Sequence, residues 1–561
     1  MLAPSRSTLL LALLPAPALG QATLFDLDPT STGSRYSAGI DLVDDIDGDG
    51  IDDIVVSDDA TGDGKVFVHS GADGTVLRTW LPSLNAQAYG RSVAGVGDVD
   101  GDGFGDVAIG DPNAAGSRGR LEIRSGATGA VLLTMQGSGG SDWLGESVAA
   151  IGDLDGDGVT DLAVGAPGDD LTHNDNVGSV SFVSGATGAV LRVVYGSGTI
   201  PRMGWRVDGA GDVDGDGVPD VIIASLHVNS GGSNAAGEAH LVSGATGQVL
   251  HHFAASTQFE WFAHDVAGIG DVDGDGVGDV AIGVMHERTI GWRGGSVIVY
   301  SGATGAQLYE AFPETGVARF GASVDGGGDV NGNDVPDIVV GAPGEWGLIP
   351  AYGEQYSTGV TYVLSGDDGR RLFAFDGDGI SHRFGSDALL AGDLDGDGFD
   401  DVIGGADQWV AGQPGDGYAR VFRGGPTDAY GIATTCVATL NSTGGATTLA
   451  ARGTTSVTQD HLLLEVTGGP PLAPTIVVVG SASASTPFGA GSLCVGGQAV
   501  RLSLLRMPTT GAFSHWVALE GTMLGTLLVP GSTWHFQVLF RDGGASQGAN
   551  TSDALSVLFV P

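Results

Sequence analysis

The nine-residue stretch Asp153-Leu-Asp-Gly-Asp-Gly-Val-Thr-Asp161 decides the fold, because the chain repeats it. The pattern Asp-x-Asp-Gly-Asp-Gly-x-x-Asp occurs almost unchanged six times and once in degraded form, with first residues Asp45, Asp98, Asp153, Asp212, Asp271, Asp329 and Asp393. Successive copies begin 53 to 64 residues apart. Because self-similarity at such a period is typical of repeat architectures, the sequence predicts seven copies of one supersecondary unit.

The stretches on either side of the acidic string are repeated as well. Around the third copy they read SVAAIGD before the string, DLAVGAP directly after it, and then GSVSFVSG and VLRVVYG. The pentapeptide SGATG recurs at Ser125, Ser184, Ser243 and Ser301, with SGADG at Ser70 and SGDDG at Ser365. These runs are rich in β-formers and are separated by glycine turns, so each unit offers four short strands.

Four strands per unit indicate either a β-propeller or a string of separate domains. Units this short could not each bury a core, whereas a closed propeller packs blade against blade and protects the sheet edges. The seventh unit loses its fourth strand after Gly424, and residues 22–28 (ATLFDLD) supply a candidate for it. We therefore predict an all-β chain with a seven-bladed propeller over residues 21–428, in which the first strand completes the seventh blade.

Three motifs recur in fixed order over residues 22–425. They are aromatic-Gly pairs (Tyr89-Gly90, Phe320-Gly321, Phe384-Gly385), the acidic loop, and Gly-Ala-Pro at Gly165 and Gly341. Together they resemble the FG-GAP repeats of integrin α-subunit propellers. The resemblance implies a seven-bladed propeller with calcium in the loops between the first and second strands of the blades. It does not imply integrin function, because one fold serves many roles.

The acidic loop also has the chemistry of a calcium site without the resemblance. Aspartates at positions one, three, five and nine and the backbone carbonyl at position seven can converge on one point, which gives the all-oxygen shell that calcium prefers. The alternative is a metal-free Asp-Gly turn, but turn formation needs one aspartate and not four. The predicted ligands are Asp45, Asp47, Asp49, Ile51, Asp53; Asp98, Asp100, Asp102, Phe104, Asp106; Asp153, Asp155, Asp157, Val159, Asp161; Asp212, Asp214, Asp216, Val218, Asp220; Asp271, Asp273, Asp275, Val277, Asp279; Asp329, Asn331, Asn333, Val335, Asp337; and Asp393, Asp395, Asp397, Phe399, Asp401.

The sixth copy departs from the pattern. It carries the neutral side chains Asn331 and Asn333, and Asp334 replaces the second glycine. We expect it to be the weakest of up to seven calcium sites, or empty.

Charge and the N-terminal residues indicate where the protein works. The formal net charge is −44, which argues against nucleic acid and acidic membranes as partners. Arg6, the apolar run 9–14 and the small residues Ala18 and Gly20 are typical of a secretory signal peptide over residues 1–20. No later stretch is apolar enough over about twenty residues to span a bilayer. We expect a secreted or envelope-associated monomer.

Residues 429–561 form a second region of low charge, rich in Ser and Thr. Strand-like runs at 461–466, 475–479, 500–505 and 534–540 predict a small β-sandwich. Its final stretch resembles the C-terminal modules of secreted planctomycete-type bacterial proteins. Cys436 and Cys494 are the only cysteines, and an oxidising exterior favours a disulfide between them over two free thiols.

The face opposite the acidic loops is the predicted ligand face, because the connections between second and third strands emerge there. The candidate ligand-binding residues in and beside the longest of these connections are Trp261, His286, Trp292, Arg293, Trp346, Tyr352 and Tyr356. Aromatic rings with an arginine can bind a sugar or a peptide, although these rings could equally cap the blade cores. No Ser-His-Asp or paired-glutamate spacing stands out. The sequence therefore favours an extracellular binding or adhesion protein, with a polysaccharide lyase-like enzyme or a structural envelope protein as alternatives.

Overall fold

The computed structural model describes residues 23–558 with gaps. The gaps are 28–35, 59–63, 83–87, 171–176, 197–201, 227–236, 255–260, 286–293, 314–318, 345–358, 378–382, 408, 411–412, 415–416, 426–431, 437–447, 454–461, 468–472, 489–490, 507–512, 518–532 and 541–549. The predicted signal peptide lies outside the described residues. The chain divides into two compact units, Thr23–Thr427 and one that holds Asp428–Pro561.

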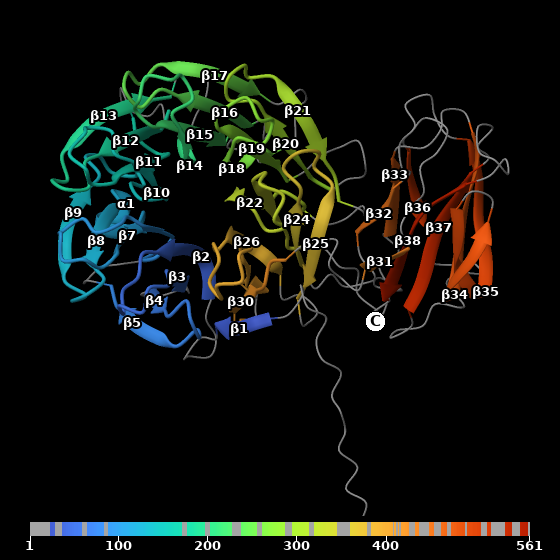
Figure 1. Cartoon of the computed structure of the whole chain (residues 1–561). Coiled ribbons are helices and arrows are strands. Elements are labelled where there is room, and N and C mark those ends of the chain that lie inside the picture. The colour runs from blue at the N-terminus through green and yellow to red at the C-terminus, as the bar shows by residue number, and fades with distance from the viewer. Residues whose placement is uncertain are drawn as a thin grey trace, which may run out of the picture. The chain divides into compact units, whose positions relative to one another are not determined.

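The first unit is a ring of seven four-stranded antiparallel sheets, which confirms the predicted seven-bladed propeller (Figure 1). The blades run in chain order and each pairs its strands in sequence order, except the seventh. Their strands are β2 (Tyr36–Val43), β3 (Asp53–Asp58), β4 (Lys65–His69), β5 (Val76–Trp80); β6 (Ser92–Gly95), β7 (Asp106–Asp111), β8 (Arg120–Ser125), β9 (Val131–Gln136); β10 (Ser147–Gly152), β11 (Asp161–Ala166), β12 (Ser179–Val183), β13 (Val190–Tyr195); β14 (Met203–Gly211), β15 (Asp220–Leu226), β16 (Gly237–Val242), β17 (Val249–Ala254); β18 (Phe262–Gly270), β19 (Asp279–Val284), β20 (Ser296–Tyr300), β21 (Gln307–Ala311); β22 (Ser323–Gly328), β23 (Asp337–Ala342), β24 (Val360–Leu364), β25 (Arg371–Asp376); and β26 (Phe384–Leu390), β27 (Val402–Ala406), β30 (Tyr418–Phe422) and β1 (Thr23–Leu27).

The seventh blade is assembled from both ends of the propeller. Its order is β1-β30-β27-β26, and β1 pairs antiparallel with β30 from Thr23 opposite Phe422 to Leu27 opposite Ala419. Figure 1 shows the blue β1 beside the orange β30. The prediction that the N-terminal strand completes this blade is confirmed: β1 pairs with the edge of β30 that would otherwise be unpaired, so the seventh blade has four strands like the other six. A two-stranded hairpin, β28 (Trp409–Val410) with β29 (Gln413–Pro414), also lies within this part of the chain.

The aromatic-Gly and Gly-Ala-Pro motifs meet in space. Within the third blade, the Gly145 N–H donates 2.9 Å to the Gly165 carbonyl, and a side chain on Gly165 would collide with the backbone of Gly204 in the fourth blade at 2.1 Å. In the third and fourth blades, Leu144 and Met203 replace the aromatic residue. The residue that follows this position has a positive φ in all seven blades, and Ser37 (φ 64) and Ala263 (φ 55) replace glycine there. Glycine is favoured because only it adopts this conformation without strain and permits such close backbone approach.

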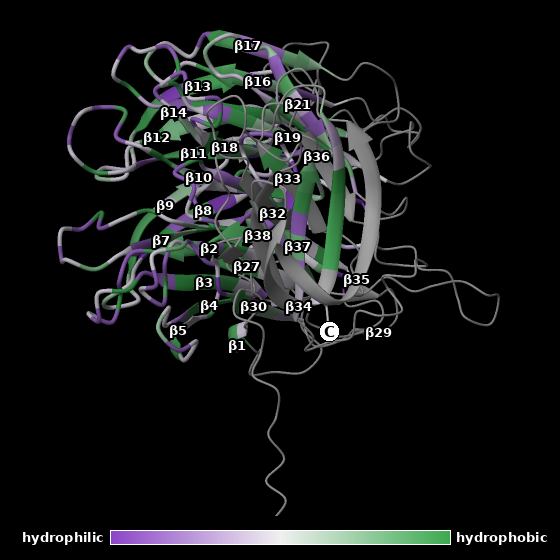
Figure 2. Ribbon diagram, turned by 45° about the vertical axis from the view of Figure 1, so that its right-hand side comes forward, coloured by the Kyte–Doolittle hydropathy of each residue, from purple (hydrophilic) through white to green (hydrophobic). Residues whose placement is uncertain are grey.

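The hydrophobic core lies between neighbouring blades. One cluster joins Val43 and Val55 of the first blade to Val93 and Val107 of the second, and similar clusters join later blades. The second strands are buried along their whole length in all seven blades, which explains their continuous apolar composition. In Figure 2 the hydrophobic colour concentrates in the strands, and the hydrophilic colour is more frequent in the loops.

The second unit contains two antiparallel sheets. The order of the five-stranded sheet is β31-β38-β37-β34-β35 and that of the three-stranded sheet is β32-β33-β36. The strands are β31 (Ile432–Cys436), β32 (Thr448–Gly453), β33 (Leu462–Thr467), β34 (Pro474–Phe488), β35 (Gly491–Arg506), β36 (Phe513–Val517), β37 (Thr533–Phe540) and β38 (Asn550–Leu558). The four strand-like runs of the sequence fall in β33, β34, β35 and β37, except that His461 lies outside the described residues. Face-to-face packing as a β-sandwich stays a prediction.

Two further predictions concern the disulfide and membrane-spanning segments. Cys436 lies in β31 and Cys494 in β35, but their side chains lie outside those described, so their disulfide stays a prediction. The helical element of the described chain is the short α1 (Ala114–Ser117), in which Ala115 (φ 54) and Gly116 (φ 79) are left-handed. Among the described residues, no helix is long and apolar enough to cross a membrane.

Candidate metal centres

Each acidic string forms a loop between the first and second strands of its blade, as predicted. In the third loop, Asp153 accepts backbone N–H bonds from Gly156 (2.7 Å), Asp157 (3.2 Å) and Gly158 (2.8 Å). The two glycines have φ of 80° and 87°, which lets the loop curl around this carboxylate. The first aspartate thus organises the loop and keeps the other carboxylates near it.

The aspartate at position nine is buried and ties the loop to the rest of the blade. Asp161 has no exposed surface and accepts the N–H of Leu154 (2.7 Å) and that of Gly185 (3.0 Å). Gly185 belongs to the SGATG pentapeptide, so this bond explains why the pentapeptide and the acidic loop recur together. The equivalent aspartates Asp53, Asp106, Asp220, Asp279, Asp337 and Asp401 make the same two bonds. Sequence reasoning missed this second role.

The loops gather carboxylates that repel one another in the absence of a cation. In each of the first four loops, three aspartates offer oxygens within 4.8 Å of one another, for example Asp153, Asp155 and Asp161. Burial, with neighbouring carboxylates adding to it, raises the pKa of Asp53 and that of Asp106 to about 6. By contrast, the bond from Gly158 and others from the backbone lower the pKa of Asp153.

The residues present fit a hard divalent cation. The side-chain ligand atoms are carboxylate oxygens in six loops, and in the sixth loop the amide oxygens of Asn331 and Asn333 replace two of them. Each carboxylate keeps lone pairs beyond those that its backbone N–H bonds use. Calcium prefers six to eight oxygen ligands in a flexible shell, whereas magnesium demands a stricter octahedron. The residues that would hold calcium are those predicted from the sequence, and the ion would supply the positive charge that these loops lack.

The sixth and seventh loops differ from the other five. In the sixth loop, the Asn331 amide donates 2.8 Å to Asp337, and Asp334 adopts a left-handed φ of 61° where the other loops have glycine. In the seventh loop, Arg423 contacts the carboxylate of Asp395, and its Nε lies 3.6 Å from Asp397 Oδ2. Arg423 stands where the other six blades have the serine of the pentapeptide. A cationic side chain therefore already neutralises part of the seventh loop.

Of the seven predicted ligand-face residues, the structure describes Trp261. His286, Trp292, Arg293, Trp346, Tyr352 and Tyr356 lie outside the described residues. Trp261 is described: it precedes β18, whose other end leads into the loop at Asp271, so it lies on the face opposite the acidic loops. Its ring stacks on that of His264, with the centroids 6.0 Å apart.

A set of large side chains occupies the position of Trp261 in other blades, and sequence reasoning missed it. In blades three to seven, one residue directly precedes the aromatic-Gly position, and it has a left-handed backbone in each of these blades. These residues are Trp143, Arg202, Trp261, Arg319 and Arg383. We call this set the rim. Two neighbouring members are in contact: the Arg202 guanidinium lies 5.3 Å from the Trp143 ring centre. Non-glycine residues at positive φ are uncommon, and such strain clusters at ligand sites.

Comparison with known families agrees with the architecture. The FG-GAP repeat family matches residues 89–132, 144–183 and 320–364, and the FG-GAP-like repeat family matches residues 45–109. These segments include the acidic loops at Asp45, Asp98, Asp153 and Asp329. The chain is therefore a seven-bladed propeller that carries FG-GAP repeats.

Curated relatives are integrin α subunits. Integrin alpha-V of Gallus gallus is 31% identical over 242 residues, which is 40% of this chain and 23% of the relative. Integrin alpha-5 of Xenopus laevis is 36% identical over 172 residues, or 27% of this chain and 16% of the relative. Integrin alpha-PS2 of Drosophila melanogaster is 29% identical over 272 residues, or 46% of this chain and 16% of the relative. The matches thus span less than a quarter of the length of these relatives.

Proposed function

We propose that the protein is an exported, calcium-stabilised propeller that binds an extracellular ligand, as an adhesion or recognition protein. The observation that carries this proposal is the retained geometry of the acidic loops inside segments that match FG-GAP repeats. The similarity to integrin α subunits supports an extracellular binding role. The predicted signal peptide at residues 1–20 agrees with export.

The ligand would bind at the rim, on the face opposite the calcium loops. Trp143 and Trp261 offer partly exposed aromatic surface there, and Arg202 adds a cation to a chain with only 23 basic residues. Not every rim arginine is equally available, because Arg383 pairs with Asp407 at 2.9 Å. Aromatic rings beside arginine are typical of binding hot spots, and a ligand with an anionic group, such as an acidic glycan or peptide, suits this composition.

The experiment is a binding screen of the mature chain against arrays of neutral and acidic glycans and of matrix-type peptides, in millimolar calcium and in chelator. The proposal predicts binding in calcium and its loss in chelator. Trp143→Ala and Trp261→Ala should weaken binding at least about tenfold without lowering the melting midpoint. Tyr195→Ala is the matched control, because Tyr195 is an exposed aromatic on the outermost strand β13 and 44% accessible. Binding that survives both rim substitutions would contradict this location.

A further inference from the structure

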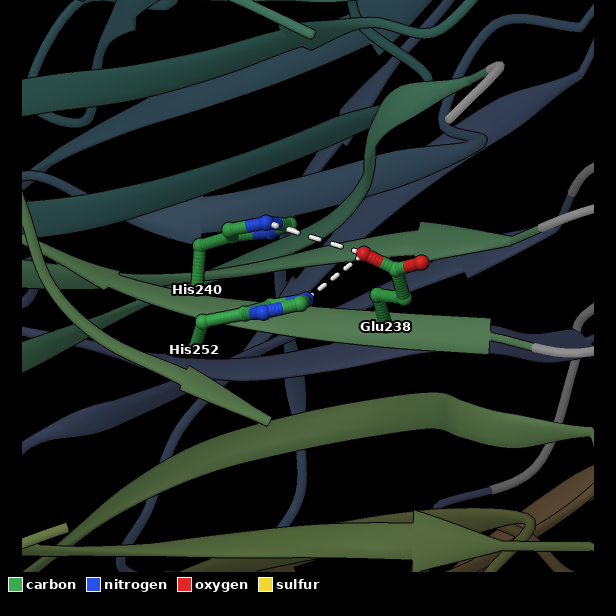
Figure 3. Close-up of side chains that lie close together, drawn as sticks. All are labelled: Glu238, His240 and His252. Carbon is green, nitrogen blue, oxygen red and sulfur yellow. Dashed lines mark hydrogen bonds and ion pairs between the residues drawn. The ribbon is translucent and has the colours of Figure 1, made fainter. Parts of the chain in front are cut away.

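The fourth blade holds a cluster of side chains that the calcium loops do not explain. Glu238 and His240 lie on β16, and His252 on β17 pairs directly with His240. Figure 3 shows both imidazole rings reaching toward the Glu238 carboxylate. The His252 Nε2 lies 2.7 Å and the His240 Nε2 3.9 Å from the same oxygen, Glu238 Oε2. One donor atom of each residue lies within 4.8 Å of the other two.

The two imidazole rings are arranged as ligands and not as an ordinary ion pair. Their planes are 15° apart with centroids separated by 4.7 Å, so the rings are stacked and two nitrogens are directed at one carboxylate. An ion pair between Glu238 and His252 would account for the 2.7 Å contact, but it would not explain why the His240 ring is also directed at the Glu238 carboxylate.

Two buried polar atoms on the side of His240 away from Glu238 have no hydrogen-bond partner among the described residues. His240 is 7% exposed, and its Nδ1 has no hydrogen-bond partner among the described residues. Ser225 is fully buried, and its Oγ is also without a partner among them. Both residues line one cavity of about 380 Å³. Buried polar groups without partners are costly. The cavity is large enough to hold water or a ligand group that would pair with them.

The donor set selects a class of metal. Two imidazole nitrogens and one carboxylate oxygen suit zinc and neighbouring transition metals, whereas calcium prefers oxygen alone. Three protein ligands leave a fourth position for water or for an anionic ligand group. The side chain of His252 is 48% exposed and that of Glu238 26%, so a metal ion can reach the cluster from solvent.

We infer that Glu238, His240 and His252 bind a zinc-class transition metal on the outer hairpin of the fourth blade. The bound metal would link β16 to β17. This site is independent of the proposed calcium loops, since it shares no residue with them.

The test is zinc titration of the full mature chain, free of any polyhistidine tag and saturated with millimolar calcium so that the acidic loops are occupied. Calorimetry should show one zinc ion bound, with a rise in the melting midpoint that calcium does not reproduce. His252→Ala and Glu238→Gln should each weaken zinc binding at least about tenfold. Both side chains are partly exposed, so the calcium-saturated melt of each variant should match that of the parent.

His251→Ala is the matched control, because His251 is adjacent on β17 and outside the cluster. It should bind zinc like the parent. The inference is overturned if the parent takes up no zinc under these conditions, if the His252→Ala and Glu238→Gln variants keep parental affinity, or if His251→Ala loses as much affinity as they do.

Discussion

The Asp387 carboxylate on β26 accepts a 2.9 Å hydrogen bond from the backbone N–H of Ile40 on β2, which joins the seventh blade to the first. Four other aspartates on innermost strands make the same kind of bond to the next blade: Asp41 to Gly95, Asp208 to Gly268, Asp265 to Val324, and Asp325 to Leu390. These five form a ring of carboxylates around the central axis. They hold the blades together through charge-assisted hydrogen bonds at the cost of mutual repulsion.

This ring should make stability fall as pH rises. Burial raises the pKa of Asp208 to about 8, of Asp41 and Asp387 to about 7, and of Asp265 and Asp325 to about 6, from an ordinary 3.8. Arg206 Nε, 3.6 Å from Asp265, opposes this effect. Because the folded state keeps protons that the unfolded state has released, the free energy of unfolding should decrease between about pH 4 and about pH 8.

The measurement is denaturant unfolding at saturating calcium over that pH range. Asp208→Asn keeps a hydrogen-bond acceptor and removes the titrating group, so it should flatten the slope near pH 7 by up to about 1.4 kcal/mol per pH unit. Equal slopes for the parent and the variant would show that Asp208 does not titrate in this range.

The close contact between aromatic-Gly motifs and the preceding blade predicts a large effect of Gly321→Ala. Gly321 has φ 82°, and a Cβ there would lie 2.5 Å from the Ser296 carbonyl oxygen. Gly116 in α1 has φ 79°, but a Cβ there would have no atom within 4 Å, so Gly116→Ala isolates the backbone cost of about 1–2 kcal/mol. Because of steric crowding, Gly321→Ala should lower the free energy of unfolding by about 1–3 kcal/mol more than Gly116→Ala does. Denaturant midpoints test this, and equal losses would contradict the packing argument.

Closure by the N-terminal strand is testable with one side chain. Leu27 on β1 is fully buried in the cluster that contains Tyr36 and Val421, so Leu27→Ala should cost about 2–5 kcal/mol. Thr23, exposed on the same strand, is the control, and Thr23→Ala should change stability by less than about 0.5 kcal/mol. A neutral Leu27→Ala would mean that β1 adds little to the seventh blade.

How far the sequence predicts this molecule depends on the range of each interaction. The seven blades and the pairing of β1 with β30 could be predicted, because every repeat has the same local pattern of strands and the seventh repeat lacks its fourth strand. The bond from Gly185 to Asp161, the ring bond from Ile40 to Asp387 and the His240–His252 pair join residues that only strand register or blade packing brings together. No local signal in one sequence specifies such register, although the replacement of serine by Arg423 could have been noticed by aligning the repeats.

The seventh loop should remain without calcium at concentrations that fill the first five loops. Arg423 pairs with Asp395 and Asp397, and a calcium ion would have to displace its guanidinium. Arg423→Ser restores the residue found in the other six blades, so this variant should bind one more calcium ion per chain than the parent. Calorimetric stoichiometry tests the prediction, with Arg420→Ser as the control, because Arg420 instead pairs with Asp26. An unchanged number of bound calcium ions in Arg423→Ser would show that Arg423 does not prevent calcium from binding to the seventh loop.

The most direct test of the account is the melting midpoint of the mature chain as a function of calcium concentration. Extracellular oxygen-ligand sites typically have Kd of about 10⁻⁴ to 10⁻³ M, which sets the range to titrate. Because the loops gather their carboxylates only in the folded state, the midpoint should climb through this range and fall in chelator. Asp157→Ala in the third loop should reduce the climb more than Asn333→Ala in the sixth. A midpoint that is indifferent both to millimolar calcium and to chelator would contradict the calcium-stabilised propeller.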